Sequence, residues 1–391
     1  MRSVSILVLS AVLCIPWSSS AQDTVVDKHV KVYYEKGRFG GFPANHGIWT
    51  WGNEILVGFS RGYYKDLGDE RHNIDRERPE EHALARSLDG GETWTLELPY
   101  KNGFLVPHKT GLHGVELPGV EIREPVACPG GINFTHPDFA MTLRMFGPRE
   151  APGIFYYSYD RGRKWEGPFA LPNLDTAGLV PRTDYIVENK DSVTVFLTAK
   201  KSDNKEGRVL CARTSDGGAT WKFISWVTPE PPPSANYPPN GYSYAIMPSA
   251  VRLSDKDLVC AVRWREGKPS WITVYDSHDN GKTWNDLGKV VPSTGEGNPP
   301  SMIKLKDGRI CLTYGYRAEP YSICAKISTD GGKTWTKEIV LRNDGGNRDL
   351  GYPRTALRPD GKVVTTYYIW DKESGPERYI GATIWDPSRI K

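Results

Sequence analysis

The sequence predicts an all-β protein, a single β-propeller of four-stranded antiparallel blades, with seven blades favoured and six possible. Two observations predict this fold. A turn motif recurs five times along the chain, and segments with alternating apolar residues recur between its copies. Repeats spaced by ~50–70 residues are typical of propellers, in which each repeat forms one small sheet. No stretch shows a sustained helical period, so the whole chain after its start is assigned to blades.

The recurring turn has the pattern Ser/Thr-x-Asp-x-Gly-x-x-Trp. Its Asp carboxylate can accept backbone N–H groups of the bend, its Gly allows a positive φ, and its Trp offers a large apolar plate. The copies lie at residues 87–94, 158–165, 214–221, 277–284 and 328–335. A single Asp-Gly-Gly turn is common, but five copies that all end in Trp are not. We predict that these turns are structural rather than catalytic.

A second repeat predicts the inner strands, which begin at a Pro or at a polar residue in its place. Clear hairpins follow at 249–263 and 302–314, where alternating apolar residues flank an Asp-centred turn. The predicted blade starts lie at 41–43, 135–137, 182–185, 246–248, 297–299 and 351–353. The long gap between the first two could hold one more blade near 115–129, or only a loop, which leaves both blade numbers open.

The chain divides into a leader, residues 1–21, and a single propeller catalytic domain, residues 22–391. The leader has a basic start, an apolar run from Ile6 to Pro16 and small residues before Gln22, which is typical of a secretory signal peptide. We therefore expect a secreted or periplasmic protein without a membrane anchor. The net charge of +3 is spread along the chain and gives no basic stripe for nucleic acid.

The cysteines predict neither a disulfide framework nor a zinc site, because their number after the leader is odd and their spacing is not paired. They are Cys128, Cys211, Cys260, Cys311 and Cys324. We interpret Cys211, Cys260 and Cys311, which lie in apolar strand-like runs, as small core residues, although one disulfide remains possible. No cofactor and no metal site is predicted, and a structural Ca²⁺ in a loop is left open.

Arginine, tyrosine and histidine gather at the predicted inner strands, around the axis where propellers bind ligands. A packed core would be apolar there. Arginine forks hold carboxylates and aromatic faces stack on sugar rings, so we expect a pocket for an anionic oligosaccharide or polysaccharide. The candidate substrate-binding residues are Arg182, Asp184, Tyr242, Arg263, Arg265, Asn298, Tyr316, Arg348 and Arg354.

The candidate catalytic residues are His136, Tyr185, Tyr244 and His46. Removing a proton beside a carboxylate needs a base, an acid for the leaving oxygen, and a cation that offsets the carboxylate charge. Arg182 and Arg263 are the candidate cations. A glycosidic leaving group would make the enzyme a lyase, and a ring hydroxyl would make it a dehydratase. A glycosidase would need two facing carboxylates, for which Asp184 and Glu296 are the candidates.

The repeated turn resembles the Asp-box, or BNR repeat, of the sialidase superfamily. This resemblance implies a propeller whose boxes lie on the rim, away from the catalytic pocket. True sialidases carry an Arg-Ile-Pro segment on the first inner strand, but the matching segment here is Gly-Phe-Pro at 41–43, and Arg38 is out of register. The sequence looks closer to the propeller ulvan lyases, oligosaccharide dehydratases and rhamnosyl-glucuronate hydrolases, which act on sugars containing uronic acid.

The resemblance also implies residue roles. In such lyases a His and a Tyr serve as base and acid, and the segments 134–139 and 182–185 look like their carriers here. In the rhamnosyl hydrolases a His near the mature N-terminus is assigned the catalytic chemistry, and His46 lies in the corresponding region. The predicted function is thus a secreted lyase or dehydratase for ulvan-like or rhamnose–glucuronate saccharides. The alternatives are a glycoside hydrolase, such as an α-L-rhamnosidase or exo-sialidase, and a non-catalytic sugar-binding propeller.

Overall fold

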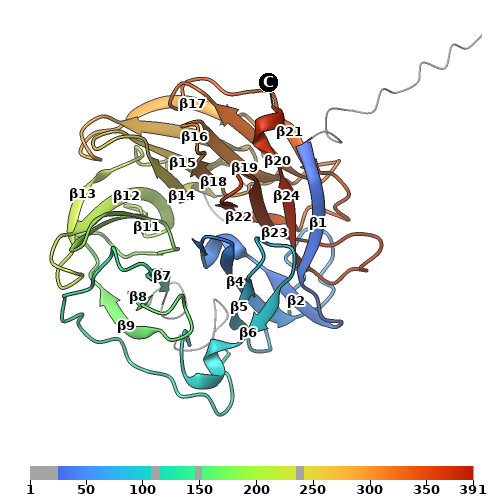
Figure 1. The fold of residues 1–391 in the computed structure, drawn as a ribbon, viewed down its shortest axis with the longest axis horizontal. Coiled ribbons are helices and arrows are strands. Elements are labelled where there is room, and N and C mark those ends of the chain that lie inside the picture. Colours follow the sequence, from blue (N-terminus) through green and yellow to red (C-terminus); the bar gives the residue numbers. More distant parts are fainter. Residues whose placement is uncertain (1–24, 107–114, 146–151, 235–241, 391) are drawn as a thin grey trace, which may run out of the picture.

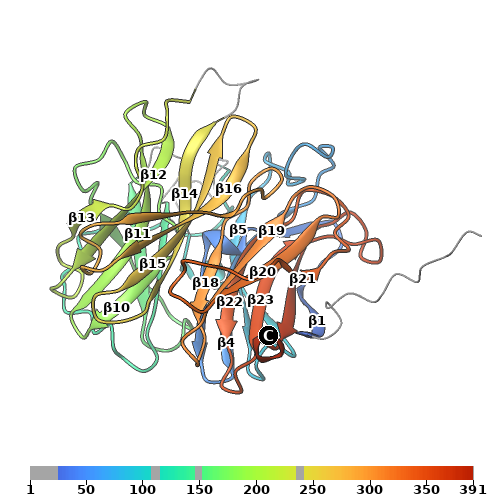
Figure 2. The ribbon, with the colours of Figure 1, turned by 90° about the horizontal axis from the view of Figure 1, so that it is seen from above.

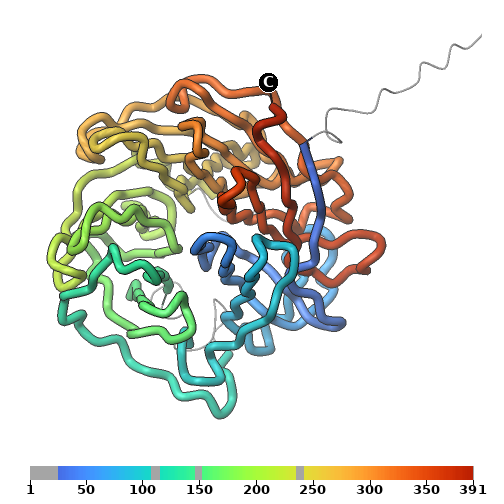
Figure 3. Tube along the Cα trace, in the orientation of Figure 1, coloured from blue at the N-terminus to red at the C-terminus, as the bar shows by residue number. Residues whose placement is uncertain are grey.

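The computed structural model describes residues 25–106, 115–145, 152–234 and 242–390, which form six sheets in a ring around a central axis (Figure 1). The chain visits the sheets in order, as the colours of the Cα trace show (Figure 3). The all-β propeller predicted from the sequence is confirmed, with six blades rather than the favoured seven. The predicted leader, residues 1–21, lies outside the described residues.

Three blades each contain four consecutive strands, and Figure 2 shows β14, β15 and β16 of the fourth blade turned by 90°. The third blade contains β10 (Tyr185–Asn189), β11 (Ser192–Lys200), β12 (Glu206–Thr214) and β13 (Lys222–Trp226). The fourth contains β14 (Ser243–Arg252), β15 (Leu258–Glu266), β16 (Ser270–Ser277) and β17 (Asn285–Val291). The fifth contains β18 (Ser301–Lys304), β19 (Ile310–Tyr316), β20 (Ser322–Ser328) and β21 (Ile339–Arg342). Their middle strands are buried on both faces because each sheet packs between two others.

The sixth blade joins the two ends of the described chain. Its inner strands are β22 (Gly351–Leu357), β23 (Val363–Ile369) and β24 (Tyr379–Trp385), and its outer strand is β1 (Val26–Tyr33). β1 pairs with β24 in an antiparallel register that sets Val30 opposite Ala382. Figure 1 shows the blue first strand beside the red last one. This pairing closes the ring, so no blade edge is left open between the first and last blades.

The first blade has an inner strand that is split in two. β2 (Arg38–Gly41) and β3 (Ile48–Trp51) both pair with β4 (Glu54–Tyr63), followed by β5 (Glu81–Ser87) and β6 (Thr95–Glu97). The short 3-10 turn η1 (Pro43–Asn45) separates the two halves.

The same break recurs in two other inner strands. Phe42, Met247 and Tyr352 have φ of 60°, 55° and 49°, and each directly precedes a proline. The ladder is interrupted at the last two of these positions as well. A proline disfavours the right-handed helical conformation of the residue before it, and here that residue adopts the left-handed one. Such breaks re-aim side chains and are found beside functional sites.

The second blade lacks an inner strand in the described residues. It contains β7 (Ala140–Met145), β8 (Gly153–Ser158) and β9 (Glu166–Leu171), and its Asp box follows β8. The box follows the third strand in the other blades, so β7 corresponds to a second strand. The segment before it runs along the outer edge instead, where Val126 N donates to Pro168 O (3.1 Å) and Ala170 N donates to Val126 O (2.8 Å). The region 115–129 is therefore a long loop and not a seventh blade.

Side chains from the neighbouring blades replace the missing strand. Met141 N donates to Tyr185 Oη (3.3 Å), and Leu143 N donates to Thr183 Oγ1 (3.2 Å). Met141 O accepts from Trp49 Nε1 (3.1 Å). These bonds satisfy backbone groups of β7 that would otherwise be buried without partners.

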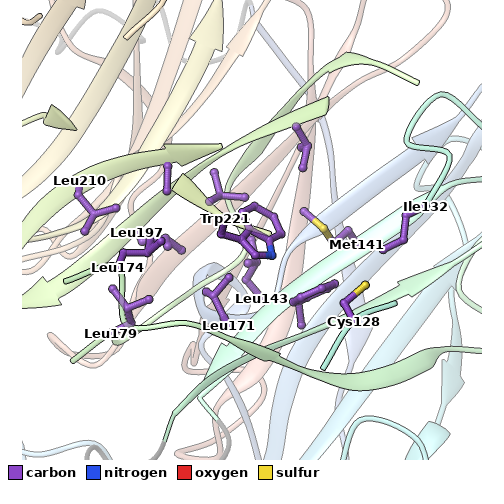
Figure 4. Close-up of a cluster of buried hydrophobic side chains, with 14 of the residues drawn as sticks. Cys128, Ile132, Met141, Leu143, Leu171, Leu174, Leu179, Leu197, Leu210 and Trp221 are labelled. Carbon is purple, nitrogen blue, oxygen red and sulfur yellow. The ribbon is translucent and has the colours of Figure 1, made fainter. Parts of the chain in front are cut away.

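Hydrophobic clusters fill the spaces between adjacent blades. The one between the second and third blades contains Met141, Leu143, Leu197 and Leu210 together with Trp221 of an Asp box (Figure 4). All five cysteines of the described residues are buried and free, which confirms the interpretation of Cys211, Cys260 and Cys311 as core residues.

The Asp boxes are hydrogen-bonded turns, as predicted. In the fourth blade, Asp279 Oδ1 accepts from Lys282 N (3.0 Å) and Thr283 N (2.9 Å), and Ser277 Oγ accepts from Gly281 N (2.9 Å). Trp284 Nε1 donates to Gly281 O (3.2 Å). The Asp thus anchors the bend and the Trp closes it.

We expect the melting temperature to fall as pH is lowered from 4 towards 2. Hydrogen bonds from Thr220 and from the backbone of Thr283 lower the pKa of Asp216 and Asp279 from 3.8 to about 2. A pKa that is lower in the folded state gives stability that is present above pH 3.8 and is lost as pH falls through 2. Calorimetry at stepped pH values tests this, and Asp279→Asn should flatten the dependence. The matched control Asp255→Asn, at an exposed position, should leave it unchanged.

Candidate active site

The antiparallel blades give the propeller two different ends. One end carries the Asp boxes together with the turns between first and second strands, and we call it the Asp-box end. The opposite mouth is formed by the starts of the first strands and the ends of the second strands, and it includes Tyr352 and Arg263. Some of the predicted site residues lie at the Asp-box end, and the others lie at the opposite mouth.

One phenol at the opposite mouth is surrounded by positive charge. Arg263 donates from Nη1 to Tyr352 Oη (3.1 Å) and from Nη2 to Tyr244 Oη (2.8 Å). Arg317 lies beside the same phenol, with its Cζ 5.2 Å from the Tyr352 ring centroid. Both guanidinium groups belong to buried residues, whereas Tyr352 is partly exposed. The structure thus brings Tyr244 and Arg263 together, as expected, around Tyr352.

The pKa of Tyr352 lies below the usual value for a phenol. Burial alone would raise it, but the charges of Arg263 and Arg317 outweigh burial and lower it. By contrast, burial raises the pKa of Tyr156 and Tyr185 to about 12. Tyr352 therefore gives up its proton more readily than Tyr156 or Tyr185.

Asn298 holds Tyr352 in its left-handed conformation. Tyr352 N donates to Asn298 Oδ1 (2.8 Å), and Asn298 Nδ2 donates to Leu350 O (3.0 Å). Asn298 is fully buried, so it positions the tyrosine rather than contacting a ligand directly. The sequence predicted that Asn298 binds substrate directly, and its burial instead favours this positioning role.

A histidine and aspartate pair lies next to Tyr352. His72 Nδ1 is 2.6 Å from Asp349 Oδ1, and the His72 and Tyr352 ring centroids are 6.3 Å apart. Because an ionised carboxylate only accepts, Nδ1 carries the proton and Nε2 is the basic nitrogen. The other donors to Asp349 are Tyr368 Oη (2.6 Å), Arg378 Nε (3.0 Å) and Asn73 N (3.1 Å). The aspartate therefore fixes the tautomer and the orientation of the imidazole.

Burial lowers the pKa of His72 despite the nearby Asp349. Burial raises the pKa of Asp349, but its contact with His72 and the charges of Arg378 and Arg317 outweigh burial and keep this pKa well below the usual range. The pair therefore consists of a neutral imidazole and a carboxylate at neutral pH. The side chain of His72 is 26% exposed, so it is accessible as a base.

Carboxylates and guanidinium groups pair along the rim of the opposite mouth. Arg182 Nη1 donates to Glu206 Oε1 (2.6 Å), and Arg348 pairs with Glu296. Arg265 donates to Gly267 O (2.8 Å). The predicted arginines at 182 and 348 are therefore each paired with a glutamate, whereas Arg265 donates to a backbone carbonyl. Two further candidates have packing contacts: Tyr242 lies 6.3 Å from Tyr244 between ring centroids, and Tyr316 packs on the core of the fourth and fifth blades.

His46 is a buried residue, with 2% of its surface exposed. Its Nε2 is 3.0 Å from Ser60 Oγ, and its Nδ1 is 3.1 Å from Arg144 Nη1. Arg144 also contacts His82 Nδ1. Burial and the charge of Arg144 lower the pKa of His46 far below its usual value, so it is a neutral acceptor for a buried guanidinium. His46 has no hydrogen bond to Tyr352, Arg263 or Tyr244, all of which the structure describes.

The Asp-box end contains a cavity of about 460 Å³ lined by four of the predicted residues, namely His136, Tyr185, Asp184 and Arg354. The His136 ring packs on Tyr159 of an Asp box, with centroids 4.6 Å apart. The prediction of one pocket shared with Tyr244 and Arg263 differs from the structure. The reason is that His136 precedes β7, a second strand, so its segment begins at the Asp-box end.

Replacing Tyr185 with Phe is expected to lower the free energy of unfolding by about 1 kcal/mol, since its hydroxyl accepts from the backbone of β7. Turnover should be unchanged. This differs from the acid or base role that the sequence suggested. Denaturant unfolding together with a rate measurement tests it, and a large loss of turnover at constant stability would restore the catalytic role.

Two further features of the described residues bear on the site. Within the four described ranges, no three His, Cys, Asp or Glu side chains group closely enough to hold a metal ion. In the same ranges, no helix has the length and apolar character needed to cross a membrane.

Comparison with known proteins agrees with this architecture. Residues 144–365 match the family model described as a BNR repeat-like domain. A sialidase from Bacteroides fragilis (strain YCH46) is 23% identical over 323 residues, covering 76% of this chain and 56% of the relative. This chain thus spans about half the length of that protein.

Two solved structures share the fold. A protein of unknown function from Dyadobacter fermentans DSM 18053 superposes with a TM-score of 0.64 at 21% identity, covering 92% of this chain and 98% of that one. An α-L-arabinanase from Penicillium chrysogenum, complexed with arabinobiose, superposes with a TM-score of 0.56 at 14% identity, covering 92% and 98%. At these identities the likeness concerns the fold alone.

Proposed function

The chain belongs to the BNR repeat-like domain family of sialidase-superfamily propellers, and from that premise we propose that it is a carbohydrate-active enzyme that cleaves a uronic-acid-containing saccharide by elimination. The reaction takes place at the opposite mouth. Tyr352 is the acid, His72 is the base, and Arg263 and Arg317 hold the sugar carboxylate.

The observation that carries this proposal is the phenol of Tyr352, whose pKa is lowered by Arg263 and Arg317. Two buried guanidinium groups beside one partly exposed phenol form a site for a carboxylate next to a proton donor. The same charges would offset the anion that forms when a proton is removed beside that carboxylate.

The chemistry follows from the protonation states. Neutral His72 takes the proton from the carbon next to the carboxylate through Nε2, and Asp349 stabilises the imidazolium that results. The C–H electron pair forms a carbon–carbon double bond, the bond to the glycosidic oxygen breaks, and Tyr352 donates a proton to that oxygen. No water is consumed, and the product carries an unsaturated uronate.

Hydrolysis is the second candidate, and it is favoured by what the relatives are named: a sialidase and an arabinanase. The phenolate of Tyr352 would then act as the nucleophile. A hydrolase also needs an acid for the leaving group. Among the described residues of the mouth, Glu206, Glu296 and Asp349 are all paired with cations, and His72 is neutral, which is why elimination ranks first.

The deciding experiment incubates the purified protein with ulvan-type and rhamnose–glucuronate oligosaccharides and records absorbance near the unsaturated-uronate band together with product mass. We expect new absorbance and chain cleavage without a gain of water. Loss of one water without cleavage would make the enzyme a dehydratase. Gain of water would make it a hydrolase, and unchanged substrates would favour a binding module.

Export is part of the proposal. Saccharide polymers that contain uronic acid are too large to cross a membrane freely, so an enzyme that cuts them has to meet them outside the cytoplasm. The leader predicted at residues 1–21 supports a secreted or periplasmic location. Fractionation of cells that express the full chain, with mass analysis of the mature N-terminus, tests this.

A further inference from the structure

We propose that the cavity at the Asp-box end is a second saccharide site, which binds a neutral sugar ring without cleaving it. It lies at the Asp-box end of the central axis, whereas Tyr352 lies at the opposite mouth. Its volume of about 460 Å³ falls in the range of small-molecule sites. The proposal does not depend on the reaction assigned to the opposite mouth.

The cavity lies beside the place where the second blade lacks an inner strand in the described residues. Phe134 and Phe139, from the segment that precedes β7, form part of its wall, and Trp51 and Tyr185 come from the first and third blades. Trp51 is partly exposed, so its ring is accessible. Aromatic walls of this kind suit the apolar faces of sugar rings.

The polar part of the cavity is an ion pair. Arg354 Nη1 is 3.6 Å from Asp184 Oδ2, and its Nη2 donates to Ala44 O (2.7 Å) and Thr183 O (2.6 Å). Arg354 is 7% exposed, and its Nε has no hydrogen-bond partner among the described residues. Arg354 and Asp184 both line the cavity, so a ligand hydroxyl there would meet this ion pair.

The charge of the ion pair favours a neutral ligand. Arg354 offsets the carboxylate of Asp184, so the two groups together carry little net charge. Burial raises the pKa of Asp184 to about 7 despite this partner, so the two charges balance above that pH. A uronate would add an uncompensated negative charge, whereas a sugar hydroxyl can donate to Asp184 and accept from Arg354. The opposite mouth, with two arginines around one phenol, has the reverse preference.

Arg354 also separates the two sites. Its bond to Ala44 ties it to the turn η1, and Asn45 of that turn accepts from Arg182 Nε (3.1 Å) at the opposite mouth. The guanidinium therefore lies between the cavity and the mouth.

The test uses saturation-transfer NMR and calorimetry with xylose, galactose, rhamnose and glucose on the full mature protein. We expect at least one sugar to bind. Trp51→Ala, which removes a wall, and Val187→Trp, which fills the cavity, should each weaken binding at least about tenfold. Tyr352→Phe should leave this binding unchanged.

Three results would overturn the proposal: no binding of any of the four sugars to the unaltered protein, binding that survives both cavity variants, or binding that is lost in Tyr352→Phe. Glucuronate serves as the charged probe. If it binds to the cavity as tightly as the best neutral sugar, the assigned preference is wrong. Circular dichroism of each variant separates loss of binding from loss of fold.

Discussion

Tyr352→Phe is expected to lower kcat/KM on a uronate saccharide by about 10²–10⁴-fold, the usual contribution of a positioned acid or base. The variant keeps the ring, which lies 5.5 Å from Phe42 between centroids, and removes only the hydroxyl. Arg263 Nη1 then loses one acceptor, which should cost about 1 kcal/mol of stability. Steady-state rates and thermal melts of the same preparation measure both effects.

Tyr244→Phe is the matched control, because its hydroxyl also accepts from Arg263 and it is buried. We expect its rate to fall much less than that of Tyr352→Phe, since the pKa of Tyr352 is the one lowered by both arginines. Equal losses in the two variants would mean that Arg263, and not the phenol, is the group that matters. Full activity of Tyr352→Phe would remove the acid from the proposed mechanism.

Most of the fold was predictable because it repeats. The five Asp boxes mark the turn between the third and fourth strands, and their spacing sets the size of a blade. The blade number was harder to predict. The sixth blade has no Asp box, and its outer strand is β1 from the start of the chain. In the second blade, the additional residues form a loop along the outer edge. Neither feature has a local signal.

The kinds of side chain at the candidate site could be predicted from the sequence, but not which residues lie there together. Arginines and tyrosines were expected at the inner strands, and two of them, Arg263 and Tyr244, meet at the opposite mouth. His72 was missed because it lies in a charged loop, and its partner Asp349 is 277 residues away. For Tyr352 the sequence carried one signal, the repeated residue before a proline. Phe42, Met247 and Tyr352 all precede a proline at a strand break. His136 also precedes a proline, but β7 is not an inner strand, so the same pattern leads to the other end.

Asp349→Ala is expected to destabilise the protein by about 3–5 kcal/mol, because it leaves a buried cation without its partner. Arg378, which is 2% exposed, donates to Asp349 Oδ2, and Tyr368 and His72 lose their acceptor as well. Urea unfolding measures the loss. Asp344→Ala is the matched control, since it removes an aspartate that pairs with Arg342 but is 55% exposed. An exposed ion pair contributes about 0–1 kcal/mol.

Asp349→Asn separates stability from catalysis at the same position. The amide keeps the shape and one acceptor oxygen, so it should destabilise the fold less than Ala does, but it can no longer stabilise an imidazolium on His72. We expect kcat to fall by about 10²–10⁴-fold. The pKa of His72 in the unaltered protein is lowered from 6.5, so the acid limb of its rate profile should lie below pH 6.5 and move further down in the variant. If the variant keeps both the rate and the acid limb, His72 is not the base, and the hydrolytic use of Tyr352 becomes the better account of the mouth.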